Sequence, residues 1–216
     1  MILIKNMQLI RYRECPSTPW KNGGGSTKQL LISPTNADLS NFDYRISIAR
    51  VSSSGPFSQF IDIDRQLCLL EGAGLRLYIQ GDNFGSAAIL TPNDAPFNFR
   101  GETQIESQLL DDQVLDFNVM TKRGRYSSNI EKIYINDTFI YGSNRNTLGT
   151  TQEQTVCIPL QLLLCLEPVI WDQNGHLTQL ERYDLLLCPH GESLNFKSDN
   201  PTQWLHITLS RSKATS

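Results

Sequence analysis

Short runs of apolar residues, separated by polar and turn-forming residues, recur along the whole chain. In "YRISIARV" at 44–51 and "DFNVMT" at 116–121, apolar and polar side chains alternate with a period of two. Such alternation, bounded by Gly, Pro, Asn and Asp, is typical of short antiparallel strands. Similar segments lie at 65–72, 75–80, 87–92, 131–136, 138–142, 159–167, 168–172, 184–189 and 203–209. Helical periodicity is nearly absent, and "ADLSNF" at 37–42 predicts one turn or a loop. The pattern predicts an all-β fold.

The two halves of the chain share a weak repeat. "ILTPNDAPFNFRGET" at 89–103 resembles "LLCPHGESLNFKSDN" at 186–200, with Pro92 opposite Pro189. Repeats of this kind indicate duplicated structural units. We therefore expect two similar β-barrel or sandwich lobes, residues 1–145 and 146–216, packed as one compact unit, with Pro92 overlying Pro189.

Composition excludes several classes of partner. The net charge of −3 and the lack of any block of basic residues argue against nucleic acid binding. No segment approaches the ~20 apolar residues that span a bilayer, so no membrane association is expected. "MILIKNMQLI" at 1–10 carries Lys5 and no cleavage site, which favours a first strand over an export signal. The five cysteines form no CxxC motif and suggest reduced, buried thiols in a cytoplasmic protein.

The segment from Asp184 to Leu194 resembles the later cupin signature, in which an Asp precedes a strand and PxGxxH closes it. In metal-binding cupins the final His of this signature is a ligand. Leu194 takes its place here, and Phe97 takes it in the first copy of the repeat.

The earlier cupin signature, an HxH followed by Glu and a glycine turn, aligns with "SQFIDIDRQLCLLEGAG" at 58–74. The histidine places then fall near Ser58 and Phe60, and the Glu place falls on Arg65. Arginine and phenylalanine offer no lone pairs to a metal ion, so we expect no metal or other cofactor. The three histidines, at 176, 190 and 206, have no ligand spacing and are expected to be surface or capping residues.

The strings "PWKNGGG", "RISIA" and "DFNVM", in this order, closely resemble the HutD/Ves family of bacterial bicupins, which is often associated with histidine utilisation. The resemblance is strong from about Pro19 to Met120 and weak beyond. The chain differs from the family at Ile61-Asp62, where a Pro-Gly pair is usual. This difference affects the rim of the pocket rather than its floor. The resemblance implies a cytoplasmic, metal-free bicupin whose pocket binds a small ligand.

The loop "PWKNGGGSTK" contains Trp20, Lys21, Asn22, Gly23 and Gly24. Consecutive glycines allow positive φ angles and a close approach of backbone N–H groups to an anion. Alternatively, the glycines let the chain pass tightly across a barrel mouth that Trp20 plugs. Lys21 is expected to lie at this mouth.

The period of two places Arg45 and Ser47 on one face of their strand, and Asp116 and Asn118 on one face of theirs. Each pair then offers polar groups to the wall of a pocket. The alternative is a structural salt bridge between Arg45 and Asp116. Both can hold, because a carboxylate can orient an arginine that also binds a ligand.

Together these residues predict an anion pocket, in which cationic groups pair with a carboxylate and neutral groups hydrogen-bond to its other atoms. The cationic groups are Arg45, Arg65 and Lys21, and the neutral ones are Asn22, Ser47 and Asn118. The resemblance suggests urocanate, formiminoglutamate, formylglutamate or formate as the ligand.

Three functions remain open from the sequence. The first is a regulatory protein of histidine and urocanate catabolism that binds a small carboxylate. The second is a metal-independent isomerase or hydrolase in which Lys21 or Asp116 is the general base. The third is a structural module, which a pocket filled by its own side chains would favour. The sequence is compatible with a homodimer and does not decide the oligomeric state.

Overall fold

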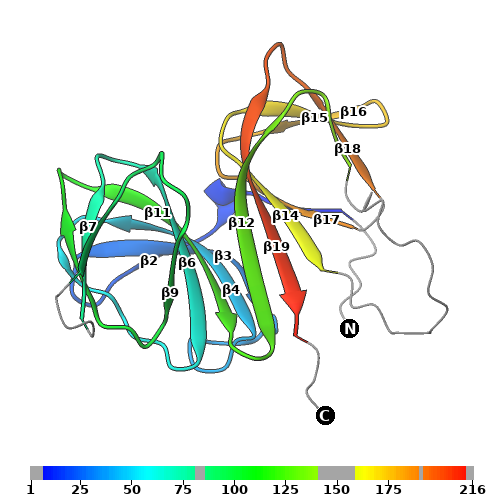
Figure 1. Ribbon diagram of the computed structural model, residues 1–216. Coiled ribbons are helices and arrows are strands. Elements are labelled where there is room, and N and C mark those ends of the chain that lie inside the picture. Colours follow the sequence, from blue (N-terminus) through cyan, green and yellow to red (C-terminus); the bar gives the residue numbers. More distant parts are fainter. Residues whose placement is uncertain (1–6, 81–85, 141–158, 190–191, 213–216) are drawn as a thin grey trace. The chain divides into compact units, whose positions relative to one another are not determined.

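The computed structural model describes residues 7–80, 86–140, 159–189 and 192–212, which form an almost entirely β structure (Figure 1). The chain divides into two compact units. The N-terminal unit comprises Cys15–Ser128 and Ser212, whose backbone N–H donates to the carbonyl of Arg125. The C-terminal unit comprises the described residues up to Glu14 and Asn129–Arg211. The all-β prediction is confirmed, and none of the described segments forms a helix long and apolar enough to cross a membrane.

The division between the units differs from the expected one. The predicted boundary near residue 145 lies outside the described residues. Strand β1 (Gln8–Ile10), most of β12 (Tyr126–Ile135) and β13 (Thr138–Ile140) belong to the C-terminal unit, although the sequence assigned them to the first lobe. The reason for β1 is its pairing with β17 (Leu185–Cys188) near the other end of the chain.

Two sheets form the N-terminal unit, with strand orders β2-β3-β4-β11-β6-β9 and β5-β10-β7-β8. The first contains β2 (Ser17–Pro19), β3 (Gly25–Ser33), β4 (Tyr44–Val51), β6 (Ile63–Glu71), β9 (Phe97–Arg100) and β11 (Val114–Lys122). The second contains β5 (Gly55–Pro56), β7 (Leu75–Ile79), β8 (Ser86–Leu90) and β10 (Ile105–Leu109). Residues 37–42 form a loop with a turn, as predicted, whereas β3 was not predicted.

The C-terminal unit also has two sheets, with orders β1-β17-β14-β19-β12 and β13-β18-β15-β16. Its further strands are β14 (Leu160–Cys165), β15 (Val169–Gln173), β16 (His176–Leu180), β18 (Ser193–Lys197) and β19 (Thr202–Arg211). The 3-10 turn η1 (Tyr12–Glu14) follows β1 and is held by Asp184, which accepts from the backbone N–H of Tyr12 at 3.0 Å.

The two units repeat one topology, but the predicted alignment of the repeat is wrong by one strand. The order β4-β11-β6-β9 corresponds to β12-β19-β14-β17, so β9 is the counterpart of β17. Pro92 precedes β9, whereas Pro189 follows β17. The turns that match are those before β9 and β17. Asp94 accepts from the N–H of Thr91 at 2.7 Å, and Asp184 accepts from the N–H of Glu181 at 3.0 Å.

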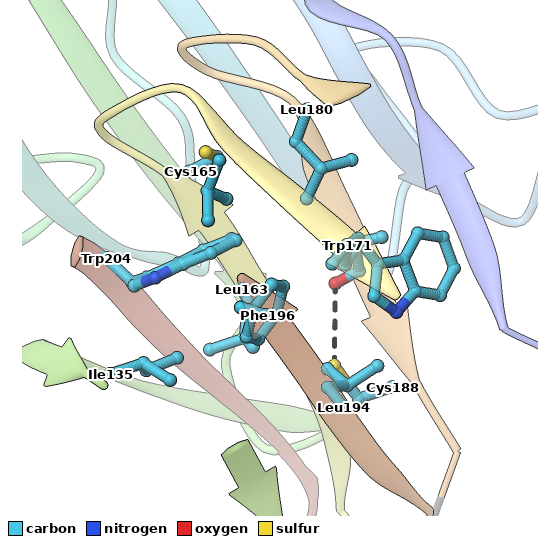
Figure 2. Close-up of a cluster of buried hydrophobic side chains, with 11 residues drawn as sticks. Ile135, Leu163, Cys165, Trp171, Leu180, Cys188, Leu194, Phe196 and Trp204 are labelled. Atoms are coloured by element: carbon cyan, nitrogen blue, oxygen red, sulfur yellow. Dashed lines mark hydrogen bonds between the residues drawn. The ribbon is translucent and has the colours of Figure 1, made fainter. Parts of the chain in front are cut away.

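The C-terminal unit is filled by its own side chains (Figure 2). Figure 2 shows Leu163 and Phe196 between Trp204 on one side and Trp171 on the other. The rings of Phe196 and Trp204 lie 4.7 Å apart, and the Trp204 indole N–H donates to Thr202 at 2.8 Å. The buried cluster comprises Ile135, Leu163, Cys165, Val169, Trp171, Leu180, Leu186, Cys188, Leu194, Phe196 and Trp204. Burial raises the pKa of the Cys165 and Cys188 thiols to about 12, so both stay protonated.

Candidate functional site

Three adjacent strands of the N-terminal unit bring together five of the predicted polar residues, namely Arg45, Ser47, Arg65, Asp116 and Asn118. Lys21 and Asn22 lie outside these strands, in the loop between β2 and β3. Strand β11 lies between β4 and β6, and Met120 is paired with Arg45 on one side and Arg65 on the other. Residues paired across a sheet point to the same face. Because neighbouring strands lie about 4.7–4.9 Å apart, the two arginine Cα atoms are about 9–10 Å apart.

The next pairs along the same face carry the other predicted residues. Asn118 is paired with Ser47 and with Leu67, and two residues further Asp116 is paired with Ala49 and with Leu69. Leu67 and Leu69 belong to the buried core of this unit, so the shared face is the interior one. The period of two predicted these faces correctly.

Arg45 is held in place by three side chains. Its Nε donates to Gln29 Oε1 at 2.9 Å, and its Nη1 donates to Ser47 Oγ at 3.3 Å and lies 3.8 Å from Met120 Sδ. Burial lowers the pKa of Arg45, and the nearby Asp116 partly offsets this effect. The guanidinium therefore remains a cation in a partly desolvated place.

Arg65 lies inside a cage of aromatic rings. Its guanidinium carbon is 4.7 Å from the ring centre of Phe99, 5.5 Å from that of Phe57 and 5.7 Å from that of Phe60. The side chain donates from Nη1 to the carbonyl of Ser58 at 3.2 Å. Its Nε is buried and has no hydrogen-bond partner among the described residues. Burial lowers the pKa of Arg65 to about 10, so the group is still charged at neutral pH.

Asp116 and Asn118 complete this polar interior. Both are buried, and the Oδ1 atom of each lacks a hydrogen-bond partner within the part of the chain that the structure describes. Burial raises the pKa of Asp116 to about 7, against the attraction of Arg65 and Arg45. The hydrogen bonds of Arg45 go to other side chains, so the structure does not contain the Arg45–Asp116 salt bridge that the sequence left open.

The glycine loop forms a tight turn at the end of the β2–β3 hairpin. The N–H of Gly23 donates to the carbonyl of Trp20 at 3.0 Å, and the N–H of Gly24 donates to Asn22 Oδ1 at 3.1 Å. Both donors are therefore used within the loop rather than offered to an anion. Lys21 and Asn22 are exposed.

At two of the glycine positions, Gly24 and Gly25, the surrounding atoms leave no room for a side chain. A Cβ on Gly24 would lie 2.4 Å from Ser53 Oγ, and a Cβ on Gly25 would lie 2.3 Å from the carbonyl oxygen of Arg50. The ring of Trp20 lies against Gly25, packs on the core of this unit and donates from Nε1 to Thr27 at 2.8 Å. The geometry matches the alternative in which the glycines permit close passage of the chain beneath Trp20.

Four residues around the arginines were not predicted: Gln29, Phe57, Phe60 and Phe99. Gln29 lies on β3, a strand that the sequence pattern did not predict. Phe57 and Phe60 lie in the irregular loop between β5 and β6, where no periodicity indicates which way a side chain faces. The alternation in "FNFR" at 97–100 places Phe97 and Phe99 on one face. It does not reveal that Phe99 is paired with Arg65.

The positions at which metal-binding cupins have their metal ligands hold other side chains in this protein. Phe60 belongs to the aromatic cage, Arg65 lies inside that cage, and Leu194 is part of the C-terminal core. No group of three or more His, Cys, Asp or Glu side chains at metal-binding distance occurs within residues 7–80, 86–140, 159–189 and 192–212. His206, expected at the surface or as a cap, is instead half-buried, in contact with Gln161 and edge-on to Phe139. His176 is exposed, and His190 lies outside the described residues.

Comparison with known sequences places the chain among a group of bacterial proteins. The family model described as HutD matches residues 12–206. An uncharacterized 21.2 kDa protein in the hutC 3' region of Pseudomonas putida is 36% identical over 128 residues, which is 59% of this chain and 65% of that protein. Protein Ves of Citrobacter koseri is 30% identical over 190 residues, 87% of this chain and 92% of that protein.

Solved structures share the fold. A conserved protein of unknown function from Pseudomonas aeruginosa PAO1 has a TM-score of 0.75 at 26% identity, covering 95% of this chain and 99% of that one. HutD from Pseudomonas fluorescens SBW25, in a formate condition, has a TM-score of 0.73 at 24% identity, covering 96% and 100%. Oxalate decarboxylase from Bacillus subtilis has a TM-score of 0.57 at 8% identity, covering 97% and 77%. The cupin-like architecture is therefore shown.

Proposed function

Because the chain belongs to the HutD family, we propose that it is a metal-free, cupin-like protein that binds a small carboxylate inside the N-terminal unit and regulates histidine and urocanate catabolism. The observation that carries the proposal is Arg65, a caged guanidinium whose buried Nε has no partner among the described residues. The hutC-region name of the Pseudomonas putida relative supports the metabolic context, and the formate condition of the Pseudomonas fluorescens structure supports a first ligand to try.

Charge favours an anion at this place. Arg45 and Arg65 are both cations, and Asp116 is the acidic group that acts on both of them. The two arginines repel each other in a desolvated interior, and a bound carboxylate relieves that repulsion. The Arg65 guanidinium carbon lies over the rings of Phe57 and Phe99, and its Nη1 already donates to Ser58. Its Nε has no hydrogen-bond partner among the described residues and is the donor that we expect a planar anion to use. Charge-assisted hydrogen bonds contribute about 1.5–3 kcal/mol each.

A thermal-shift series tests the proposal. Formate, urocanate, formylglutamate and formiminoglutamate are each compared with a neutral amide analogue. A ligand that binds the native state alone adds about 2.7 kcal/mol at a hundred times its Kd, so the Tm should rise with a carboxylate and much less with its amide. Equal shifts from the carboxylates and the amides would falsify the proposal.

Variants locate the binding site. Arg45→Ala and Arg65→Met should each remove most of the shift, the second while keeping an apolar side chain inside the aromatic cage. Arg50 is exposed on the same strand as Arg45 and out of phase with it, so Arg50→Ala should retain the shift. Each variant is compared with its own ligand-free Tm, which separates loss of binding from loss of stability.

A second candidate, a metal-independent isomerase or hydrolase, is favoured by one observation. Asp116 is buried, and its pKa is raised to about 7, near the value that suits a general base at neutral pH. Incubating the protein with the four carboxylates and following their proton NMR spectra tests for turnover. Conversion that Asp116→Asn abolishes while binding persists would support the enzyme. Unchanged spectra favour the binding protein.

A further inference from the structure

A groove of about 510 Å³ opens on the surface of the N-terminal unit, within the size range of small-molecule sites. It lies between the β3–β4 loop and the β5–β6 loop, and the start of β6, the end of β11 and the turn after it complete its lining. We call it the outer groove, and its lining includes Leu39, Phe42, Phe60, Ile61, Ile63 and Lys122.

The outer groove presents apolar side chains to solvent. Leu39 is 54% exposed and Ile61 is 70% exposed, and they come from different loops. Phe42 and Ile63 beneath them are buried and form a small core with Met120. Large apolar side chains that gather around a hollow indicate a binding surface more than isolated exposed ones do.

Phe60 and Met120 separate the outer groove from the two arginines. The Phe60 ring centre is 6.4 Å from that of Phe42 and 5.7 Å from the Arg65 guanidinium carbon. Met120 packs against Phe42 and Ile63, while its Sδ lies 3.8 Å from Arg45 Nη1. Phe60 is partly exposed and lies outside the strands, so its ring can reorient without breaking a sheet.

The cations at the rim of the groove are already paired. Lys122 Nζ lies 3.5 Å from Asp62, and Arg125 Nη1 lies 2.5 Å from Asp43. Each acidic partner offsets the charge of its cation, so the groove suits an uncharged, apolar group. The charge that attracts an anion lies behind Phe60, at Arg65.

We propose that the outer groove receives the apolar body of a carboxylate whose charged end binds Arg65, with the Phe60 ring, which lies between the groove and Arg65, turning aside. This inference rests on the proposed function and narrows it. The ligand class is a monocarboxylate with an aromatic or similarly flat apolar body, rather than a one-carbon anion. Such a ligand contacts both the outer groove and Arg65, whereas formate contacts Arg65 alone.

Titration calorimetry with formate and 3-phenylpropionate tests this inference. The wild-type protein should bind 3-phenylpropionate at least tenfold more tightly than formate, and Arg65→Met should weaken both. If formate binds and 3-phenylpropionate binds no more tightly, the groove inference is wrong and the proposed function stands. If neither ligand binds, both fail. If 3-phenylpropionate binds Arg65→Met as well as it binds wild type, the groove acts without the arginine and the inference is wrong.

Variants of exposed residues test whether the groove causes the tighter binding of 3-phenylpropionate. The double variant Leu39→Ala and Ile61→Ala should lower the affinity for 3-phenylpropionate at least fivefold and leave that for formate within twofold. Ile89 is 55% exposed on β8, in the other sheet of the same unit, and Ile89→Ala is the matched control that should change neither affinity. Equal losses for both ligands in the double variant contradict the inference.

Discussion

Asp116, a buried carboxyl group, should make the stability of the protein depend on pH. Its pKa is about 7 in the folded chain against 3.8 for the unperturbed group. Between these values the folded state holds a proton that the unfolded state has lost. The free energy of unfolding contributed by Asp116 therefore falls as the pH rises from about 4 to 7, and the full cost of ionisation persists above pH 7.

Replacing Asp116 by Asn removes that cost, so the variant should lose less stability than wild type between pH 5 and pH 8. Urea unfolding at both pH values measures the difference, which should amount to a few kcal/mol because each pKa unit corresponds to about 1.36 kcal/mol. Parallel pH profiles for the two proteins would show that Asp116 is ionised in the folded chain over this whole range.

At the scale of elements, the glycine loop and β3 depend on one backbone contact. A side chain at position 25 would collide with the carbonyl oxygen of Arg50 on the neighbouring strand, a backbone atom that cannot turn away. Gly25→Ala should therefore destabilise the protein by about 1–3 kcal/mol, as overpacking usually does. Thermal unfolding checks this value.

The control for this prediction lies two residues earlier in the same loop. Gly23 has a φ of +74° and open space around its Cβ position, and asparagine tolerates this region of backbone angles. Gly23→Asn should therefore cost less than Gly25→Ala. The reverse order would indicate that the turn conformation, rather than the close contact with β4, limits the loop.

The sequence predicted those features of the site that depend on neighbouring residues. Alternation placed Arg45 with Ser47 and Asp116 with Asn118 on single faces, and the structure has both pairs facing the interior. Which strands become neighbours depends on contacts between distant segments, so neither the pairing of Met120 with both arginines nor the Phe99 contact with Arg65 could be predicted.

The misaligned repeat has a related cause. Strand–turn–strand segments in a β protein look alike, and the Pro92 and Pro189 segments matched although they occupy successive positions in the topology. The side-chain hydrogen bonds of Asp94 and Asp184 to their own turns are the stronger marker of equivalence. An aspartate that closes a turn three residues back is visible in sequence, but aligning Pro92 with Pro189 takes Asp94 and Asp184 out of register.

At the scale of the whole molecule, the two units have one topology and different interiors. The strand pair β6 and β11 of the N-terminal unit, which contains the paired Arg65 and Met120, corresponds to the strand pair β14 and β19 of the C-terminal unit, which contains the paired Gln161 and Thr208. Strand β11 carries the buried Asp116, whereas its counterpart β19 carries Trp204, which is fully buried in the core. The duplicated architecture has therefore kept a polar, cationic interior in one unit and filled the other with apolar side chains.

This difference predicts the stoichiometry of binding. An anion needs a cation to offset its desolvation, and the buried polar side chain on β14, Gln161, carries no charge. Titration calorimetry of the full chain should therefore give one carboxylate per chain, and Arg65→Met should remove most of the binding heat. Leu163→Ala, in the core of the C-terminal unit, should lower stability by about 2–5 kcal/mol while leaving the affinity unchanged at temperatures where the chain is folded. Two carboxylates per chain, or residual binding in Arg65→Met that Leu163→Ala abolishes, would show that the C-terminal unit retains a site of its own.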